Sequence, residues 1–193
     1  MLNHIYKSID GWFSFPKLYS EMVNKFPSGS LFVEVGSYFG CSFSYLVIEA
    51  INSGKKIDCV AVDACPWPSV EPNFTANMKP FEGHFRTKFG GDSFDRAKEF
   101  EDNSIDFCFI DANHTYEFVS KDIAAFLPKM KKGGIIAGHD FNLHHPGVIQ
   151  AVNEAFVESV AGAYYKPEDG RPMEKPGKGF LYNKEEDTWI VQL

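Results

Sequence analysis

Several features that mark particular protein classes are missing from this chain of 193 residues. No apolar run approaches the about 18 residues that a membrane-spanning helix needs, and the first residues, MLNHIYKSIDGWF, contain no apolar segment typical of a signal peptide. The cysteines form no CxxC pair, which argues against a zinc site. We therefore expect a cytoplasmic protein with reduced core thiols. The cysteines are Cys41, Cys59, Cys65 and Cys108.

Basic residues are also in short supply. The chain has 19 Lys and Arg against 26 Asp and Glu, so its formal net charge is −7. Proteins that bind nucleic acids gain much of their affinity from basic side chains against phosphate, so this balance argues against a nucleic-acid partner, and it equally argues against an anionic membrane surface. A small-molecule or protein partner is favoured, and the composition leaves open whether two copies form a homodimer.

Short apolar runs alternate with helical patterns along most of the chain. Strands that are nearly continuous in apolar residues and separated by single helices indicate a parallel sheet covered on both faces, which is a doubly wound α/β fold. Strands are expected over 31–36, 57–63, 84–90, 104–111 and 135–140, and helices over 42–52, 92–100, 115–130 and 146–160. The glycines at 133–134 are expected to end the third of these helices.

Other segments depart from this alternation. The last residues, 180–193, are expected to form a hairpin that adds antiparallel pairing to the sheet, and 166–179 is expected to be a loop because it is rich in proline, glycine and charge. Four prolines in 64–82 predict an irregular segment there. All of these segments are assigned to one domain, 1–193.

The N-terminal segment carries an aromatic stripe at helical spacing. Its residues are Trp12, Phe13, Phe15, Leu18, Tyr19, Met22 and Phe26. Such a stripe is typical of core packing, and its alternative role is a lid over a bound acceptor. We therefore divide the domain into a helical cap segment, 1–28, and an α/β core, 29–193.

The sequence VEVGSYFGCS (33–42) predicts a strand, a glycine turn and a helix start. Its ExGxxxG spacing differs from the GxGxxG of a pyrophosphate-binding turn. Glu34 beside the turn would repel a pyrophosphate, whereas it would suit a ligand that carries an ammonium group. A tight strand–helix turn without a ligand remains the alternative.

Acidic residues end the other strands as well. Asp63 follows the second strand 23 residues after Gly40, where α/β folds place an acid that holds ribose hydroxyls (about 20 residues on). Asp92 and Ser93 follow the third strand, where they could receive an adenine amino group, and Asp111 ends the fourth. Each could instead cap a helix or turn, but their repeated position at one edge of a sheet favours a ligand site.

These motifs together resemble the class I S-adenosylmethionine-dependent methyltransferases, and most of all the small-molecule and sugar O-methyltransferases of the macrocin type. The resemblance covers roughly 30–160 and rests on VEVGSYFG, VAVD, GDSFD, SIDFCFIDANHTYEFVSKDI and GGIIAGHD. It implies a seven-stranded Rossmann-like sheet and S-adenosylmethionine as the cofactor. The implied cofactor residues are Glu34, Gly36, Ser37, Gly40 and Ser42 at the methionine end, Asp63 at the ribose, Asp92 and Ser93 at the adenine with Trp67 over it, and Asp111 in the same row of acids.

The reacting end is expected where IDANHTY (110–116) and GHDFN (138–142) meet. Asp111, His139 and Asp140 form a set that could hold a divalent cation, Mg²⁺ or Mn²⁺. A metal or a histidine base would help a hydroxyl acceptor, because alcohols are poor nucleophiles near neutral pH. His114 and His139 are both candidate bases, and the residues do not separate them; helix capping for His114 is the alternative.

The resemblance is incomplete at this end. Phe141 follows Asp140, where catechol-type O-methyltransferases have an Asn ligand, so metal dependence stays open. The function that the sequence favours is methylation of a small hydroxylated acceptor, such as a sugar or natural-product hydroxyl. Two alternatives are a nicotinamide-dependent oxidoreductase, which the ExGxxxG spacing opposes, and a non-catalytic cofactor-binding or assembly module, which the polar residues at 111–140 oppose.

Overall fold

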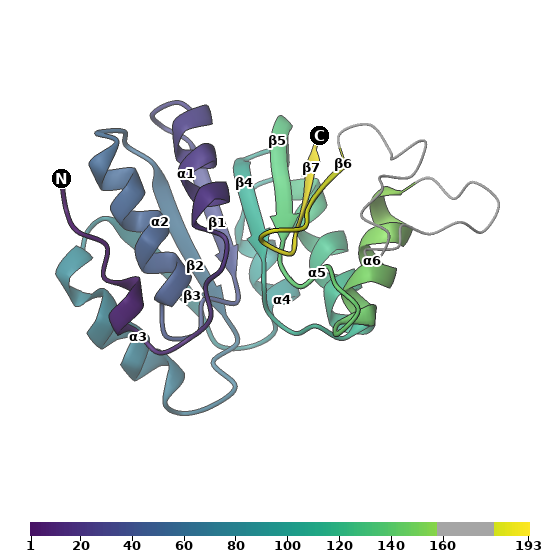
Figure 1. The fold of residues 1–193 in the computed structure, drawn as a ribbon, viewed down its shortest axis with the longest axis horizontal. Coiled ribbons are helices and arrows are strands. Elements are labelled where there is room, and N and C mark those ends of the chain that lie inside the picture. The colour runs from purple at the N-terminus through teal and green to yellow at the C-terminus, as the bar shows by residue number, and fades with distance from the viewer. Residues whose placement is uncertain (158–179) are drawn as a thin grey trace.

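The computed structural model describes residues 1–157 and 180–193, which form a seven-stranded sheet with helices on both faces (Figure 1). The strand order is β3-β2-β1-β4-β5-β7-β6; β1 to β5 pair in parallel, and β7 pairs antiparallel with both β5 and β6. The expected doubly wound sheet and its C-terminal antiparallel hairpin are therefore confirmed. The strands are β1 (Leu31–Val35), β2 (Asp58–Asp63), β3 (Phe85–Phe89), β4 (Ile105–Ile110), β5 (Met130–Gly138), β6 (Phe180–Asn183) and β7 (Thr188–Gln192).

Six α-helices cover this sheet within the described residues, and none of them has the length and apolarity to cross a membrane. They are α1 (Pro16–Lys25), α2 (Cys41–Asn52), α3 (Val70–Met78), α4 (Ser93–Arg96), α5 (Tyr116–Phe126) and α6 (Pro146–Phe156). Short 3-10 turns lie at Tyr6–Ser8, Lys79–Phe81, Ala97–Glu99 and Leu127–Lys129.

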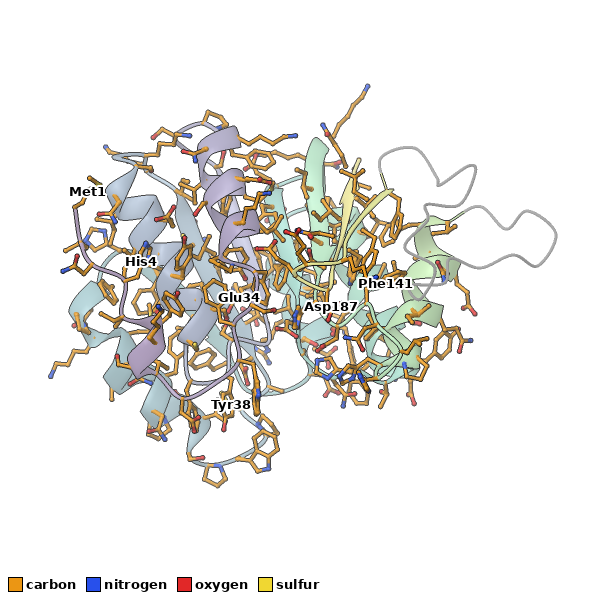
Figure 2. The ribbon with its side chains drawn as sticks, viewed as in Figure 1. Met1, His4, Glu34, Tyr38, Phe141 and Asp187 are labelled. Atoms are coloured by element: carbon orange, nitrogen blue, oxygen red, sulfur yellow. The ribbon has the colours of Figure 1, made fainter. Side chains whose placement is uncertain are left out.

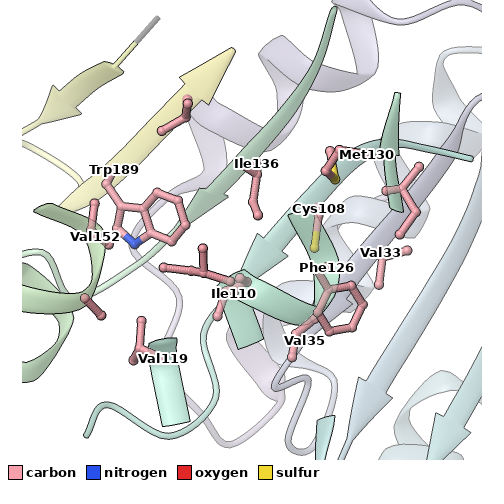
Figure 3. Packing of buried hydrophobic residues seen from close by; sticks show 14 of the residues in the cluster. Val33, Val35, Cys108, Ile110, Val119, Phe126, Met130, Ile136, Val152 and Trp189 are labelled. Carbon is pink, nitrogen blue, oxygen red and sulfur yellow. The ribbon is translucent and has the colours of Figure 1, made fainter. Parts of the chain in front are cut away.

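The core has two halves because side chains of a strand alternate between the faces of the sheet. On β4, Phe107 and Phe109 face a cluster formed with α1, α2 and α3. Cys108 and Ile110 face the opposite cluster, which is formed with α5 and α6 and includes Trp189 of β7 (Figure 3). The same alternation turns the side chain of Glu34 on β1 toward α1 and α2. This acid therefore lies in the buried layer between the sheet and these two helices.

The segment 64–82 is more regular than expected, because it contains helix α3. Its proline at 72 falls in the first turn of α3, where backbone N–H groups have no partner inside the helix. Proline therefore costs little at this position, and the expectation of an irregular segment was wrong for Val70–Met78.

The long helix expected over 115–130 ends earlier, at Phe126. Leu127–Lys129 is a 3-10 turn that contains a proline, and β5 begins at Met130, so the glycines at 133–134 lie inside a strand instead of ending a helix. Met130 pairs with Ile105, and the register between β4 and β5 shifts after that pair. The expected helix over 146–160 is confirmed as far as Phe156; its last residues from 158, and the loop expected at 166–179, lie outside the described residues.

The N-terminal aromatic stripe is mainly core. Phe15, Leu18 and Tyr19 are at most 2% exposed and belong to the cluster of α1 and α2. Trp12 is the exception, because it is 83% exposed. Core packing is therefore confirmed for α1, and a covering role for the residues that precede α1 stays a prediction.

A substitution at Gly138, at the end of β5, can test how tightly the C-terminal hairpin packs against β5. A Cβ at this position would lie 2.5 Å from the carbonyl oxygen of Ile110 and 2.6 Å from the ring of Trp189. We expect Gly138→Ala to destabilise the fold by about 1–3 kcal/mol through overpacking, which corresponds to roughly 3–10 °C in Tm. Thermal unfolding followed by circular dichroism measures the shift. Leu181→Ala on β6, where the side chain is 64% exposed, is the matched control and should leave Tm nearly unchanged; equal Tm values for the two variants would contradict the packing argument.

Candidate active site

The turn after β1 is packed against the chain that follows β4. Gly36 has a φ of 93°, and a Cβ there would lie 2.1 Å from the carbonyl oxygen of Asp111, so only glycine fits. The N–H of Gly36 donates to the carbonyl oxygen of Val62 at 2.8 Å, and that of Asp111 donates to Val35 at 2.8 Å. These contacts bring the carboxyl ends of β1, β2 and β4 together at one edge of the sheet.

Glu34 is a buried acid at this edge, and only 1% of it is exposed. The hydroxyl of Tyr19 donates to Oε2 at 2.5 Å, and the hydroxyl of Ser42 donates to Oε1 at 3.0 Å. Figure 2 labels Glu34 near the middle of the view, beside α1 and β1. Burial raises the pKa of Glu34 to about 8, although both hydroxyl donors act to lower it. The acid expected at the cofactor turn is thus enclosed, with a donor on each oxygen.

Tyr19 is a hydrogen-bond partner of Glu34 that sequence reasoning missed. The aromatic stripe correctly assigned its ring to the core, but spacing along a helix does not show where a buried hydroxyl finds its partner. A buried tyrosine usually has a hydrogen-bond partner, and this general rule was the one available signal.

Asp63 organises the loops that follow β1 and β2. It is 7% exposed, and its two carboxylate oxygens accept the backbone N–H groups of Tyr38 and Cys65, each at 2.7 Å. Its carbonyl oxygen accepts the N–H of Gly90 at 2.9 Å, which ties the end of β3 to the same place. Tyr38 lies at the rim in Figure 2, with its ring centroid 6.3 Å from that of Trp67, which is 60% exposed.

Asp92 and Ser93, the pair that was expected at the adenine, have different environments. The hydroxyl of Ser93 donates to Oδ1 of Asp122 on α5, and both residues are buried. Burial raises the pKa of Asp122 to about 6. Asp92 is exposed at the start of α4, so it is the member of the pair that faces outward.

The residues that were expected at the reacting end form a cluster of imidazoles and carboxylates. Nε2 of His114 lies 3.0 Å from Oδ2 of Asp140 and 3.3 Å from Oδ1 of Asp111. Hydrogen bonds to Asp111 and Asp140 raise the pKa of His114 to about 9. Burial alone would raise the pKa of Asp140, but hydrogen bonds from His114 and His139 hold it well below its usual range. His114 is therefore held between two acids.

His139 has a different environment from His114. Its Nε2 lies 2.9 Å from the hydroxyl oxygen of Ser14, and its Nδ1 lies 3.4 Å from Oδ2 of Asp140. Burial opposes the charged imidazole, but Asp140 and Asp111 outweigh it and raise the pKa of His139. Ser14 is a second residue that sequence reasoning missed, because it reaches His139 from a segment 125 residues away.

The structure also places two other residues of this region. His145 belongs to the cluster, with Nε2 3.6 Å from Oδ1 of Asp140 and its ring centroid 4.6 Å from that of His114. Phe141 is fully buried against Phe180 and Tyr182, and its N–H donates to the carbonyl oxygen of Asp187 at 3.1 Å (Figure 2).

The candidate residues thus fall into two groups at one edge. Glu34, Ser37 and Ser42 lie together, with the hydroxyl of Ser37 3.5 Å from the carbonyl oxygen of Glu34. Asp111, His114, His139 and Asp140 form the second group. Asp63 and Asp92 lie at the ends of the neighbouring strands β2 and β3.

Solved structures share this fold at low identity. CalS11, a TDP-rhamnose 3′-O-methyltransferase of calicheamicin biosynthesis, is 16% identical, with a TM-score of 0.57 over 92% of this chain and 76% of that one. A Staphylococcus aureus protein provisionally described as a caffeoyl-CoA O-methyltransferase is 14% identical, with a TM-score of 0.60 over 97% and 87%.

Sequence comparison identifies the family. A curated protein of Acanthamoeba polyphaga mimivirus, called uncharacterized protein R132, is 27% identical over 159 residues, which is 74% of this chain and 67% of that protein. A family model described as methyltransferase domain matches residues 33–141, which is more than half of the chain. The chain therefore belongs to this methyltransferase family.

Proposed function

We propose that the protein transfers a methyl group from S-adenosylmethionine to a hydroxyl of a small acceptor. The observation that carries this proposal is the hydrogen bond between His139 and a hydroxyl oxygen, that of Ser14, at 2.9 Å. Nε2 of a neutral His139 can accept the proton of an acceptor hydroxyl that takes the place of the Ser14 hydroxyl, and Asp140 lies on the other side of the ring. The O-methyltransferases among the similar structures support the same reaction.

The edge of the sheet suits the cofactor. Gly36 lets the turn after β1 pack directly against the backbone of Asp111, and Glu34 provides a buried acid for the ammonium group of the methionine end. Asp63 can accept ribose hydroxyls beside the two N–H groups that it already binds, because each carboxylate oxygen accepts more than one hydrogen bond. Asp92 would receive the adenine amino group. The match to a methyltransferase family argues against the alternative function, a nicotinamide-dependent oxidoreductase.

S-adenosylmethionine supplies an electrophilic methyl group on a positively charged sulfonium. His139 is the proposed general base: an acceptor hydroxyl in the position of the Ser14 hydroxyl would pass its proton to Nε2, while Asp140 faces Nδ1 and stabilises the imidazolium that forms. Residues that hold the hydroxyl in line with the methyl group provide much of the remaining rate. His114, held between Asp111 and Asp140, fixes these two carboxylates in place.

A divalent cation is the second candidate at the same place. Ligand atoms of Asp111, His139 and Asp140 all lie within 4.8 Å of one another, so they fit one ion with mixed oxygen and nitrogen ligands. Bound there, Mg²⁺ or Mn²⁺ would lower the pKa of the acceptor hydroxyl. His139 cannot be base and ligand at once, so chelation with EDTA separates the two proposals: turnover that persists supports the base, and turnover that is lost supports the metal.

Cofactor binding gives the first test of the proposal. We expect calorimetry to detect S-adenosylhomocysteine binding and no comparable binding of NAD. Asp63→Ala should weaken S-adenosylhomocysteine binding about 10–100-fold, because hydrogen bonds to a charged group are lost. Asp58→Ala is the matched control, since Asp58 lies at the other end of β2 and pairs with Arg86. Tight NAD binding without S-adenosylhomocysteine binding would refute the cofactor assignment.

Catalysis gives the second test. His139→Ala should lower kcat about 10²–10⁴-fold, the usual contribution of a general base, and His114→Ala should lower it less because His114 acts through the two acids. Both variants should keep S-adenosylhomocysteine affinity within a few-fold of the wild type. The measurement is release of S-adenosylhomocysteine with a library of hydroxylated acceptors. Full activity in both variants would overturn the assignment, and cofactor binding without any turnover would favour the non-catalytic alternative.

The charged residues that follow the carboxyl ends of the strands bear on which charge the acceptor can carry. The segments that follow β1, β2, β4 and β5 contain no Lys or Arg over 36–54, 64–78, 111–120 and 139–157, although they include Asp111 and Asp140. Phosphate groups are usually bound by basic side chains or by helix N-termini. The absence of Lys and Arg from these segments favours an acceptor without a phosphate, in contrast to the nucleotide-linked sugar named for CalS11.

This restriction can be tested with acceptors that differ in one phosphate. We expect turnover with an uncharged acceptor such as glucose to exceed turnover with glucose 6-phosphate at equal concentration, since the acidic edge repels the phosphate. The difference should shrink at high salt, which screens charges. Preference for the phosphorylated sugar, or for TDP-rhamnose over rhamnose, would show that basic groups reach the acceptor and would contradict the restriction.

A further inference from the structure

We infer that Tyr19 is a positioning residue of the cofactor site: from helix α1, its hydroxyl holds the Glu34 carboxylate toward the ammonium group of the cofactor. This inference rests on the proposed role of Glu34 and extends it to a residue outside the glycine turn. Tyr19 is separated from Glu34 by 15 residues in sequence, and it lies in the segment that the sequence assigned to a cap.

The first argument is burial. Tyr19 is 0% and Glu34 is 1% exposed, so no solvent competes for their hydrogen bond of 2.5 Å. A buried carboxylate that loses a donor is costly to keep charged. Ser42 supplies the donor to the other oxygen, so removing Tyr19 would leave Oε2 without its partner.

The second argument is rigidity, because the position of the Tyr19 hydroxyl is set from several sides. Its ring packs edge-on against Phe107 and Phe109 of β4, with centroids 6.0 and 5.2 Å away. At the start of α1, Oε1 of Glu186 accepts the N–H of Lys17 at 3.1 Å.

The other end of α1 is fixed as well. Nζ of Lys55 donates to the carbonyl oxygens of Val23, Asn24 and Phe26 at 2.7–2.8 Å. The helix therefore cannot turn the Tyr19 hydroxyl away from Glu34 without breaking contacts at both ends.

The third argument is charge. Other titratable groups that act on Glu34 are Asp111 beyond β4, Cys41 on α2 and Cys59 on β2, and none of them supplies positive charge. Burial raises the pKa of Glu34, and the hydrogen bond from Tyr19 is the largest effect that lowers it. Without Tyr19, a larger share of Glu34 would be protonated near neutral pH and would attract an ammonium group less.

The test compares two probes in the wild type and in Tyr19→Phe. S-adenosylhomocysteine carries the ammonium group, whereas 5′-methylthioadenosine keeps the nucleoside and lacks the amino-acid portion. At pH 7 we expect Tyr19→Phe to weaken S-adenosylhomocysteine binding about tenfold and to leave 5′-methylthioadenosine binding unchanged. Because the pKa of Glu34 rises further in the variant, the rise in S-adenosylhomocysteine affinity between pH 6 and 8 should move to higher pH.

A matched control removes another tyrosine hydroxyl from the contact between α1 and α2. Tyr45→Phe deletes the 2.9 Å hydrogen bond to Ser20 and does not touch Glu34, so both probes should bind as in the wild type. In a Glu34→Gln background, Tyr19→Phe should add no further loss of S-adenosylhomocysteine affinity. This double-mutant cycle uses the same two probes and needs no catalytic turnover.

Two results would overturn the inference. Unchanged S-adenosylhomocysteine affinity in Tyr19→Phe would show that Glu34 does not need the hydroxyl, and equal weakening of both probes would show a general structural effect. If the wild type binds neither probe, the proposed function itself fails and the inference fails with it.

Discussion

Parallel pairing of β1 with β2 and β4 is the constraint on which the site depends. Strands that run in the same direction end at the same edge, so Val35, Asp63 and Ile110 finish beside one another although they are far apart in sequence. The close contact between Gly36 and the carbonyl oxygen of Asp111 then brings the two groups of polar residues near each other. A side chain at Gly36 would separate the turn from this neighbouring segment.

Helix α1 joins the two ends of the proposed site. Tyr19 contacts the acid of the glycine turn, and Ser14, just before the helix, contacts His139. The C-terminal hairpin supports this arrangement through Glu186, which accepts the N–H of Lys17 at the start of α1, and through Asp187, which accepts the N–H of Phe141. Segments from both ends of the chain thus position residues that the central sheet alone would leave unsupported.

Much of the fold could be predicted because apolar runs and helical periodicity are local properties. The parallel strands, the covering helices and the terminal hairpin follow from such patterns. The two failures have specific physical causes: proline at 72 is tolerated in the first turn of α3, and the glycines at 133–134 lie in a strand because Met130 already pairs with Ile105. Neither effect can be read from composition, since one depends on position within a helix and the other on pairing with a distant strand.

Apart from helix α3, the sequence by itself determined the order of strands and helices, and it showed the acids that end the strands, because apolar runs and side-chain alternation are local patterns. It also indicated that Asp111, His139 and Asp140 would meet. Only the tertiary structure decided the partners of these groups: Tyr19 and Ser42 for Glu34, Ser14 for His139, and the two carboxylates around His114. The physical reason is that burial and hydrogen bonding depend on which surfaces pack together, and residues 125 positions apart, such as Ser14 and His139, become neighbours only when the whole sheet is covered.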